Sequence, residues 1–286
     1  MAKAPLTKKL FVYIDKLFYN AQNSRKDVRK KDDLFEIELD IPYDGRTELN
    51  KLDVYRLKDS GKKPVVIYLH GGGFTAGDKS FRKDLSKWLA LNGYHVVNAN
   101  YALAPEEVFP APVQDAVKAC NWAYDNADKY GFDMEKVILF GDSAGAYLSM
   151  QTALIAFNKY YSDKVDAKLK FKPFGVVLDC GLYDMEDILL RRKWPADFGA
   201  KLLCDCTGCS KADYENYTYR DVISPINNVT EDCPPTLVIY SKYDVFCKGE
   251  AEKLIEKFKE KGVYFEEYAA KSPTSNNVFH LNQKNK

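Results

Sequence analysis

Short, continuous apolar runs recur along most of the chain, at residues 65–69, 96–97, 137–140, 176–178 and 237–240. Runs of this length, separated by stretches long enough for a helix, are typical of parallel strands buried on both faces. The alternating stretch 35–41 and the run 52–57 add two earlier strands, and 264–268 adds a last one. The pattern predicts about eight strands, the first two forming a hairpin and the rest mainly parallel.

Helical spacing occupies the gaps between these runs. Residues 113–124 and 251–258 each place their apolar side chains on one face, and a further helix is expected over 144–158. The N-terminal stretch shows the same one-sided spacing, at Leu6, Leu10, Tyr13, Ile14, Leu17 and Phe18. Alternating strands and helices predict an α/β fold with helices flanking the sheet.

One segment breaks this rhythm. Residues 182–224 contain no buried-strand run, but they do contain Trp194 and a tyrosine-rich stretch. We interpret this segment as an insertion that lies over the sheet. Because the sequence has no internal repeat and no low-complexity linker, we expect one catalytic domain at 34–286, with a small cap formed by 1–33 and the insertion at about 182–224.

Charge and cysteine content narrow the function classes. The chain has 42 basic and 41 acidic residues, so its net charge of +1 offers no global field for nucleic acid or an anionic membrane. No run approaches 18 apolar residues, so membrane insertion is not expected. The N-terminus does not match a signal peptide, and the seven cysteines are irregularly spaced. We therefore expect a cytoplasmic protein with reduced thiols.

Three motifs could indicate a metal or a cofactor, and each is incomplete. Cys204, Cys206 and Cys209 are close enough to suggest zinc but lack a second Cys/His pair. Residues 71–76 match a dinucleotide fingerprint, yet 93–103 lack the acidic residue that the fingerprint requires. Residues 72–80 resemble a phosphate-binding loop in which an extra Asp78 displaces the lysine. We expect no cofactor and no metal.

The most informative motif is Gly141-Asp142-Ser143-Ala144-Gly145, which follows a predicted strand and precedes a predicted helix. A serine on such a tight turn presents its hydroxyl above the sheet, and the flanking glycines avoid clashes there. The helix that begins at the serine directs its N-terminal dipole at developing negative charge. The motif predicts Ser143 as a nucleophile.

A second motif, His70-Gly71-Gly72-Gly73-Phe74, follows the strand at 65–69. A glycine-rich loop in this position frees backbone N–H groups to bind an oxyanion. We expect the donors to be the N–H groups of Gly72 and Gly73, together with that of Ala144 after the nucleophile.

A serine nucleophile also needs a base and an orienting acid. The chain has three histidines: His70 belongs to the glycine loop, and His95 begins a predicted strand, so His280 is the candidate base by elimination. In hydrolases with this serine motif the acid lies between the serine and the histidine in the chain. Asp244 directly follows the strand at 237–240, whereas Asp232 precedes it, so Asp244 is the candidate acid.

Together these motifs resemble the hormone-sensitive-lipase-type branch of the α/β-hydrolase superfamily, which includes bacterial esterases and acetyl esterases. Asn100–Glu106 resembles a further motif of that branch, Tyr-Arg-Leu-Ala-Pro-Glu, with Ala102 in place of the usual arginine. The resemblance spans roughly residues 35–281 and implies an α/β-hydrolase fold with a cap made of N-terminal helices and an insertion after the sixth strand. Two features differ from the usual pattern: Val245-Phe246-Cys247 follows the acid, and only residues 281–286 follow His280.

These observations predict a cofactor-independent serine carboxylesterase that acts through Ser143, Asp244, His280 and an acyl-enzyme. Its expected partner is a small-molecule ester; the natural ester and the oligomeric state are left open. An aryl formamide or an acetylated carbohydrate would suit the same machinery. A non-catalytic ligand receptor on this fold is the alternative from another class, and the retained triad argues against it.

The expected cap carries bulky side chains, at Phe11, Phe18, Trp194 and Phe198. If they fill the space above the nucleophile, a short acyl group fits and a long chain does not. We therefore expect short-chain acyl esters as substrates.

Overall fold

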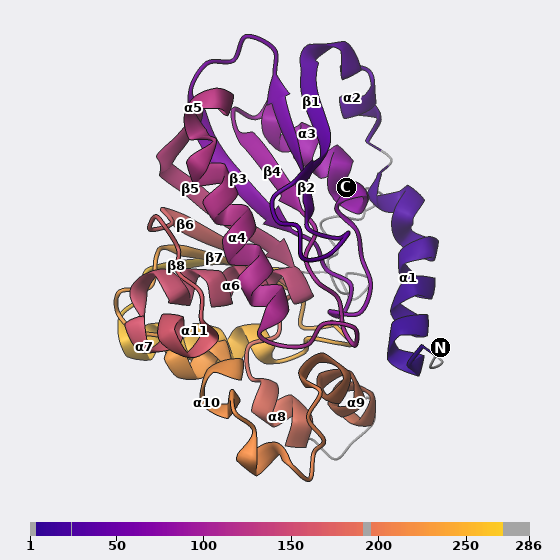
Figure 1. The fold of residues 1–286 in the computed structure, drawn as a ribbon, viewed down its shortest axis with the longest axis vertical. Helices are drawn as coiled ribbons and strands as arrows, with labels where there is room; N and C mark the ends of the chain where they lie inside the picture. The colour runs from indigo at the N-terminus through magenta and orange to yellow at the C-terminus, as the bar shows by residue number, and fades with distance from the viewer. Residues whose placement is uncertain (1–3, 24, 191–195, 271–286) are drawn as a thin grey trace.

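A single eight-stranded sheet forms the centre of the molecule (Figure 1). The computed structural model describes residues 4–23, 25–190 and 196–270. The strands are β1 (Phe35–Pro42), β2 (Lys51–Leu57), β3 (Lys63–Leu69), β4 (His95–Ala99), β5 (Phe132–Asp142), β6 (Gly175–Asp179), β7 (Thr236–Tyr240) and β8 (Phe265–Ala269). Their order is β1-β2-β4-β3-β5-β6-β7-β8. β2 pairs antiparallel with β1 and β4, and the remaining pairs are parallel, which confirms the predicted α/β-hydrolase fold.

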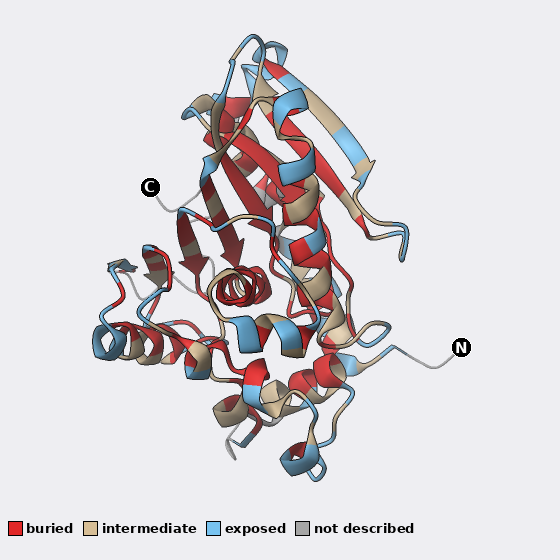
Figure 2. Cartoon of the chain, turned by 60° about the vertical axis from the view of Figure 1, so that its left-hand side comes forward, coloured by how far each residue is buried: buried red, intermediate tan, exposed pale blue. Residues whose placement is uncertain are grey.

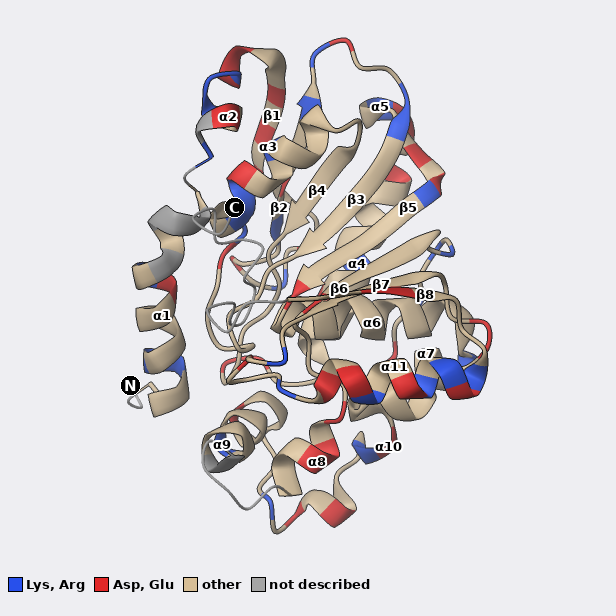
Figure 3. Cartoon of the chain, turned by 180° about the vertical axis from the view of Figure 1, so that it is seen from behind, with Lys and Arg blue, Asp and Glu red and all other residues tan. Residues whose placement is uncertain are grey.

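Helices cover both faces of this sheet. α4 (Ala111–Asp125) and α6 (Ala144–Phe157) pack on one face, and α3 (Lys83–Leu91) and α11 (Glu250–Lys261) pack on the other (Figures 1 and 3). The remaining helices are α1 (Leu6–Gln22), α2 (Lys26–Arg29), α5 (Ala127–Tyr130), α7 (Lys159–Val165), α8 (Met185–Leu190), α9 (Ala196–Thr207) and α10 (Arg220–Ile223). Within the described ranges, no helix is both long and apolar enough to cross a membrane.

The central strands are buried because helices exclude water from both of their faces. All five residues of β4 are buried, and so are the last five of β3 (Figure 2). α6 is buried over nearly its whole length, since it lies between the sheet and the segment that follows β6. The continuous apolar runs of the sequence reflect this arrangement.

The segment after β6 that lacks a buried strand is largely helical in its described part. α8, α9 and α10 lie together at one end of the molecule (Figure 1). α1 lies beside α9, although the two are far apart in the sequence. The Thr7 hydroxyl donates a hydrogen bond to the Asp205 carboxylate, and the Phe11 and Phe198 rings are 6.0 Å apart between centroids.

α1 turns a different face to the protein from the one that its apolar spacing predicts. Thr7 and Phe11 are buried and Ile14 is half-buried, whereas Leu10 and Leu17 are exposed. Thr7 and Phe11, which contact α9, lie beside the predicted stripe, and of the described side chains of the stripe only Ile14 packs against the core. Apolar periodicity located the helix but did not identify the side that is packed.

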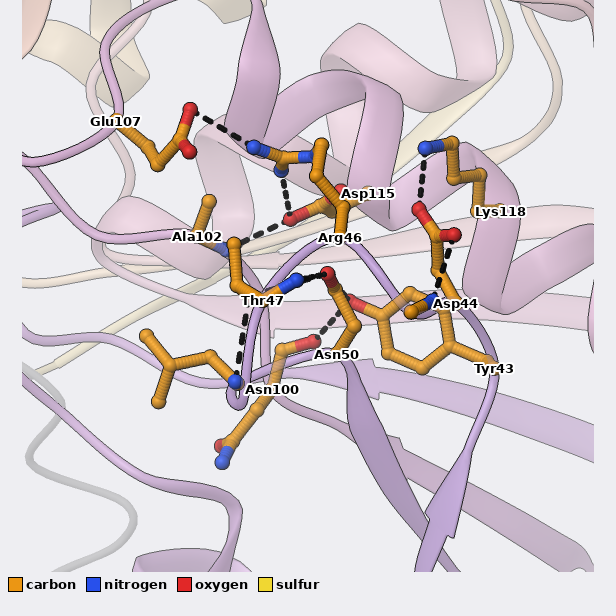
Figure 4. A network of polar contacts seen from close by, with 12 residues as sticks. Tyr43, Asp44, Arg46, Thr47, Asn50, Asn100, Ala102, Glu107, Asp115 and Lys118 are labelled. Atoms are coloured by element: carbon orange, nitrogen blue, oxygen red, sulfur yellow. Dashed lines mark hydrogen bonds and ion pairs between the residues drawn. The ribbon is translucent and has the colours of Figure 1, made fainter.

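A polar network holds the turn after β1 against the loop after β4 (Figure 4). Asp115 of α4 is fully buried, and its Oδ2 accepts hydrogen bonds from the Ala102 backbone N–H at 2.9 Å and from Arg46 Nη2 at 2.7 Å. Arg46 also pairs with Glu107 at 2.7 Å. Arg46 of the turn after β1 supplies a positive charge beside Asp115, whereas Ala102, at the position where the related motif has arginine, contributes its backbone N–H.

We predict that Arg46→Ala lowers the free energy of unfolding by about 2–3 kcal/mol, because it leaves the buried Asp115 carboxylate without its cation. Arg46→Ala combined with Asp115→Asn should recover much of this loss, since the charge is then removed as well. Denaturant unfolding measures both effects. Lys118→Ala is the control: it breaks only the more exposed pair with Asp44 and should cost less than about 1 kcal/mol. An Arg46→Ala cost no larger than the control's would contradict this account.

Candidate active site

Ser143 lies on a strained turn between β5 and α6. Its backbone has φ 51° and ψ −116°, a conformation that a residue with a side chain rarely adopts. Its N–H donates to the Asp179 carbonyl oxygen of the neighbouring strand at 2.8 Å, which fixes the turn to the sheet. The residue is partly exposed at the N-terminus of a buried helix. This is a suitable position for a nucleophilic hydroxyl.

The glycines on either side of Ser143 are required by backbone contacts. A Cβ atom on Gly145 would lie 1.9 Å from the carbonyl oxygen of Leu69, at the end of β3. A Cβ atom on Gly141 would lie 2.2 Å from the backbone of Gly145. Both contacts involve backbone, which cannot move aside as a flexible side chain can. The turn therefore closes against β3 only with glycine at both positions.

The glycine loop after β3 lies directly against this turn. Leu69 and Gly141 are partners in the β3–β5 register, so the two strands end side by side. A Cβ atom on Gly71 would be 2.4 Å from the Asp142 Oδ2 atom. Gly72 has φ 137° and Gly73 has φ 59°, both in the region that glycine tolerates. The structure thus brings the loop that carries Gly72 and Gly73 together with the Ser143 turn.

A buried ion pair between Arg82 and Asp142 anchors the Ser143 turn. Arg82, from the 3₁₀ helix η2 (Lys79–Arg82), donates to both carboxylate oxygens of Asp142, at 2.9 and 2.6 Å. The Tyr68 hydroxyl donates to Asp142 Oδ1 at 2.6 Å. Burial favours the neutral carboxyl, yet Arg82 and these hydrogen bonds hold the pKa of Asp142 below its usual value. Sequence reasoning missed Arg82 and Tyr68, because neither lies within a motif.

Two of the three histidines have structural roles. His70 stacks on Tyr101, with centroids 4.5 Å apart, and its Nδ1 is 2.8 Å from the carbonyl oxygen of Gly71. His95 lies at the start of β4, the end of the sheet far from Ser143, with Nε2 2.9 Å from the Gly61 carbonyl oxygen. Burial lowers the pKa of both imidazoles. His280, the third, lies outside the described residues.

Asp244 lies at the same edge of the sheet as Ser143, just after β7. It is buried, and its Oδ1 accepts hydrogen bonds from the backbone N–H groups of Phe246 and Cys247, at 2.7 and 2.9 Å. These bonds fix the orientation of the carboxylate. Asp232 is exposed and precedes β7, at the opposite edge.

A third carboxyl group, that of Asp179 at the end of β6, also lies at this edge. It is fully buried, and burial raises its pKa well above the usual value. A carboxyl group that is harder to ionise is less able to stabilise an imidazolium. Asp179 is therefore a poorer acid partner for a histidine than Asp244 is.

Aromatic side chains pack against the glycine loop of the candidate site. A Cβ atom on Gly73 would be 2.2 Å from the ring of Phe11, so this ring of α1 touches the loop. Phe198 and Phe246 flank Phe11, at 6.0 and 5.9 Å between centroids. Phe11 and Phe198 were expected near the nucleophile as space-filling groups. Phe18 and Trp194 were expected there too; the side chain of Phe18 and all of Trp194 lie outside what the structure describes.

A small apolar cavity lies between α4, α6 and the α8–α9 segment. Its volume is about 20 Å³, room for one water-sized group, and Phe74, Tyr147, Leu203 and Cys206 contribute to its walls. Tyr147 is one helical turn after Ser143, and its N–H donates to the Ser143 carbonyl oxygen. Burial raises the pKa of Cys206, so it serves as an apolar wall rather than as a thiolate.

Asp15 of α1 connects the N-terminal helix to the same loop. Burial is the largest effect and raises the pKa of Asp15, and the charge of Asp142 raises it further. Arg82 and a hydrogen bond from the Gly77 N–H lower it. Together these effects give a pKa of about 6. Gly77 itself packs against His70 and Gly71, where its φ of 103° leaves no space for a Cβ atom. Gly77 thus connects Asp15, a carboxyl group with a pKa of about 6, to the glycine loop.

Comparison with known proteins identifies relatives of the chain. The BD-FAE family model matches residues 52–257. Esterase LipC of Mycobacterium tuberculosis is 32% identical over 218 residues, covering 73% of this chain and 52% of that protein. An acetyl esterase of Salmonella schwarzengrund is 28% identical over 186 residues, covering 63% of this chain and 55% of that protein. The chain therefore spans about half the length of these curated relatives.

Solved structures share the fold over nearly the whole chain. Esterase B from Lactobacillus Rhamnosis superposes with a TM-score of 0.79 at 22% identity, over 98% of this chain and 90% of that chain. An esterase from Pyrobaculum calidifontis superposes with a TM-score of 0.71 at 25% identity, over 98% of this chain and 92% of that one.

The Asp15 pKa predicts a pH dependence of stability. The folded-state pKa of about 6 lies above the unfolded value of about 4, so the stability associated with protonated Asp15 is present below pH 4 and is lost as the pH rises through 6. Asp15→Asn should therefore be more stable than the wild type above pH 7, by about 1–2 kcal/mol, and equally stable near pH 3. Denaturant unfolding across this range measures the difference. A difference that does not change between pH 3 and pH 8 would contradict the prediction.

Proposed function

This chain belongs to the BD-FAE family of α/β-hydrolases, and from that premise we propose that it is a serine carboxylic ester hydrolase. The observation that carries the proposal is the contact between the strained Ser143 turn and the Gly71–Gly73 loop. This contact provides a nucleophile and an oxyanion site at one point. The two sequence relatives described above are named as esterases, which supports the same chemistry.

In the proposed mechanism, His280 accepts the proton of the Ser143 hydroxyl as the oxygen attacks the ester carbonyl. The N–H groups of Gly72, Gly73 and Ala144 bind the tetrahedral oxyanion, and each such donor is worth about 3–4 kcal/mol of the barrier. Collapse of the intermediate expels the alcohol, which takes a proton from His280. Water activated by the same histidine then hydrolyses the acyl-enzyme.

The proposed acid is Asp244, which would hold the correct imidazole tautomer and stabilise the imidazolium. Support comes from the two backbone hydrogen bonds that orient its carboxylate and from its position at the edge of the sheet where Ser143 lies. The structural roles of His70 and His95 strengthen the assignment of His280 as base.

We further propose that 1–33 and about 182–224 form a cap over this site, and that the cap selects short acyl groups. The contact of Phe11 with Gly73 and the small volume of the neighbouring cavity support a restricted acyl site. The acetyl esterase among the relatives favours acetyl esters, including acetylated carbohydrates, as candidate substrates. An aryl formamide is a further candidate for the same machinery.

The nucleophile is tested with a fluorophosphonate probe, which should label the wild-type chain and fail to label Ser143→Ala. Turnover of p-nitrophenyl acetate by Ser143→Ala should fall by about a million-fold, the loss seen when a triad nucleophile is removed. Ser210→Ala, which changes an exposed serine away from the turn, should keep both labelling and turnover. A Ser143→Ala variant that retained a tenth of the activity would refute the assignment, and an unlabelled wild type would favour the receptor alternative.

The acid is tested in the same assay by a matched pair of variants. Asp244→Asn should lower kcat by about ten-thousand-fold, because the imidazole loses its orienting carboxylate while the nucleophile and oxyanion donors remain. Asp232→Asn should have no comparable effect. The reverse order of severity would show that Asp244 is not the acid.

Acyl selectivity gives the last prediction for this site. We expect kcat/KM to be highest for acetyl to butyryl esters and to fall at least about tenfold by octanoyl, which corresponds to about 1.4 kcal/mol of barrier. Phe11→Ala should reduce that fall by opening space beside Gly73, whereas Leu10→Ala, on the exposed side of the same helix, should leave the profile unchanged. A kcat/KM that rises from acetyl through palmitoyl esters would contradict the proposed cap.

A further inference from the structure

α1 carries a second apolar face that points away from the rest of the described protein. Leu6, Tyr13 and Leu17 are 73%, 60% and 57% exposed, and Leu10 is 36% exposed. Residues 6, 10, 13 and 17 follow one another at intervals of four and three, so they form one continuous stripe along the helix. Figure 1 shows α1 along one edge of the molecule, outside the sheet and its covering helices.

The exposed stripe is separate from the face through which α1 packs on the protein. The inward face of α1 is formed by Thr7 and Phe11, which contact α9 and the glycine loop, by Asp15, which accepts a hydrogen bond from Gly77, and by Ile14, which packs against the core. The helix is thus held by a face that does not include the exposed leucines. Single exposed apolar residues are common on proteins, but a straight stripe of four on one helix indicates an interaction surface.

Lysines flank the stripe on its outer side. Lys9 and Lys16 are exposed and seven residues apart, so they lie in line along the edge of the stripe away from Ile14. The one acidic residue of α1, Asp15, is turned inward, since it accepts a hydrogen bond from Gly77 and interacts with Arg82. The exposed surface of the helix is therefore apolar and cationic, although the chain as a whole is nearly neutral.

This charge pattern disfavours a second copy of the chain as the occupant. When two identical helices pair antiparallel along such a stripe, the flank carrying Lys9 and Lys16 faces the same flank of the partner, and like charges meet. The stripe is also narrow: four side chains on a helix about 25 Å long offer less than the roughly 800 Å² per partner of a stable protein interface. A bilayer requires only one amphipathic face lying in its surface plane.

We propose that the outer face of α1 is a docking surface for an anionic lipid bilayer. Leu6, Leu10, Tyr13 and Leu17 enter the boundary between headgroups and acyl chains, and the ammonium groups of Lys9 and Lys16 bind the anionic headgroups. The helix lies in the interface and does not span the membrane. The inference is independent of the hydrolase proposal, because it uses no residue of the proposed triad.

The experiment is co-sedimentation of the full chain with lipid vesicles at low salt. We expect binding to phosphatidylcholine vesicles that contain phosphatidylglycerol, and at least about tenfold weaker binding to phosphatidylcholine alone. Lys9→Gln/Lys16→Gln should weaken binding about fivefold per lysine, and Leu10→Gln/Leu17→Gln at least about tenfold. Added salt should weaken wild-type binding, because it screens the headgroup charge.

Matched controls change exposed lysines and exposed apolar residues elsewhere on the protein. Lys30→Gln/Lys31→Gln and Leu39→Gln/Phe174→Gln should bind as the wild type does, and circular dichroism and unfolding midpoints establish that all variants are folded. The proposal is overturned if the wild type does not sediment with anionic vesicles, or if the α1 and control variants bind alike. It is also overturned if sedimentation equilibrium shows a dimer that Leu10→Gln/Leu17→Gln dissociates while vesicle binding is absent.

Discussion

Direct backbone contact between the start of α6 and the end of β3 determines the geometry of the site. Gly145 approaches the Leu69 carbonyl so closely that a single added carbon would lie 1.9 Å from the oxygen. The distance between the serine turn and the glycine loop is therefore set by two backbones rather than by adjustable side chains. Gly71, which meets Asp142 in the same way, extends this contact to the loop itself. The proposed nucleophile and oxyanion donors are held in register because there is no slack between the segments that carry them.

The close packing of the Ser143 turn against β3 buries the Asp142 carboxylate. The ion pair with Arg82 compensates for the loss of its solvation. The Asp142 carboxylate is within the serine motif, where the steric requirement for close packing would leave it desolvated. Two hydrogen bonds from Arg82 and one from Tyr68 satisfy it, and they tie the turn to η2 and β3 at once. Removing either charge would leave the other buried and unpaired, so the turn depends on both partners of the pair.

The sequence predicts contiguous features well and assembled ones poorly. The eight strands are found because a buried parallel strand leaves an unbroken apolar run, and the Ser143 turn is found because its glycines are adjacent in the chain. Arg46, Arg82 and Asp15 are missed because each meets its partner from a different element. The packed side of α1 is missed for another reason: the helix has two apolar faces, and periodicity alone does not distinguish them. For the proposed base, His280, prediction from the sequence is all that stands, since it lies outside the described residues.

The side chains that α1 exposes and buries are not those that folding stability alone would select. Burial of Leu10 or Leu17 would gain free energy, and burial of the Asp15 carboxylate costs it, yet the leucines face outward and the carboxylate faces inward. Packing therefore does not account for the outer face of this helix. Its inner face is fitted to the glycine loop, through Phe11 on Gly73 and Asp15 on Gly77, and its outer face has the apolar and cationic character of a surface helix at a bilayer. This one helix would then connect two functions, because Phe11, which helps to hold it on the protein, also touches the proposed oxyanion loop.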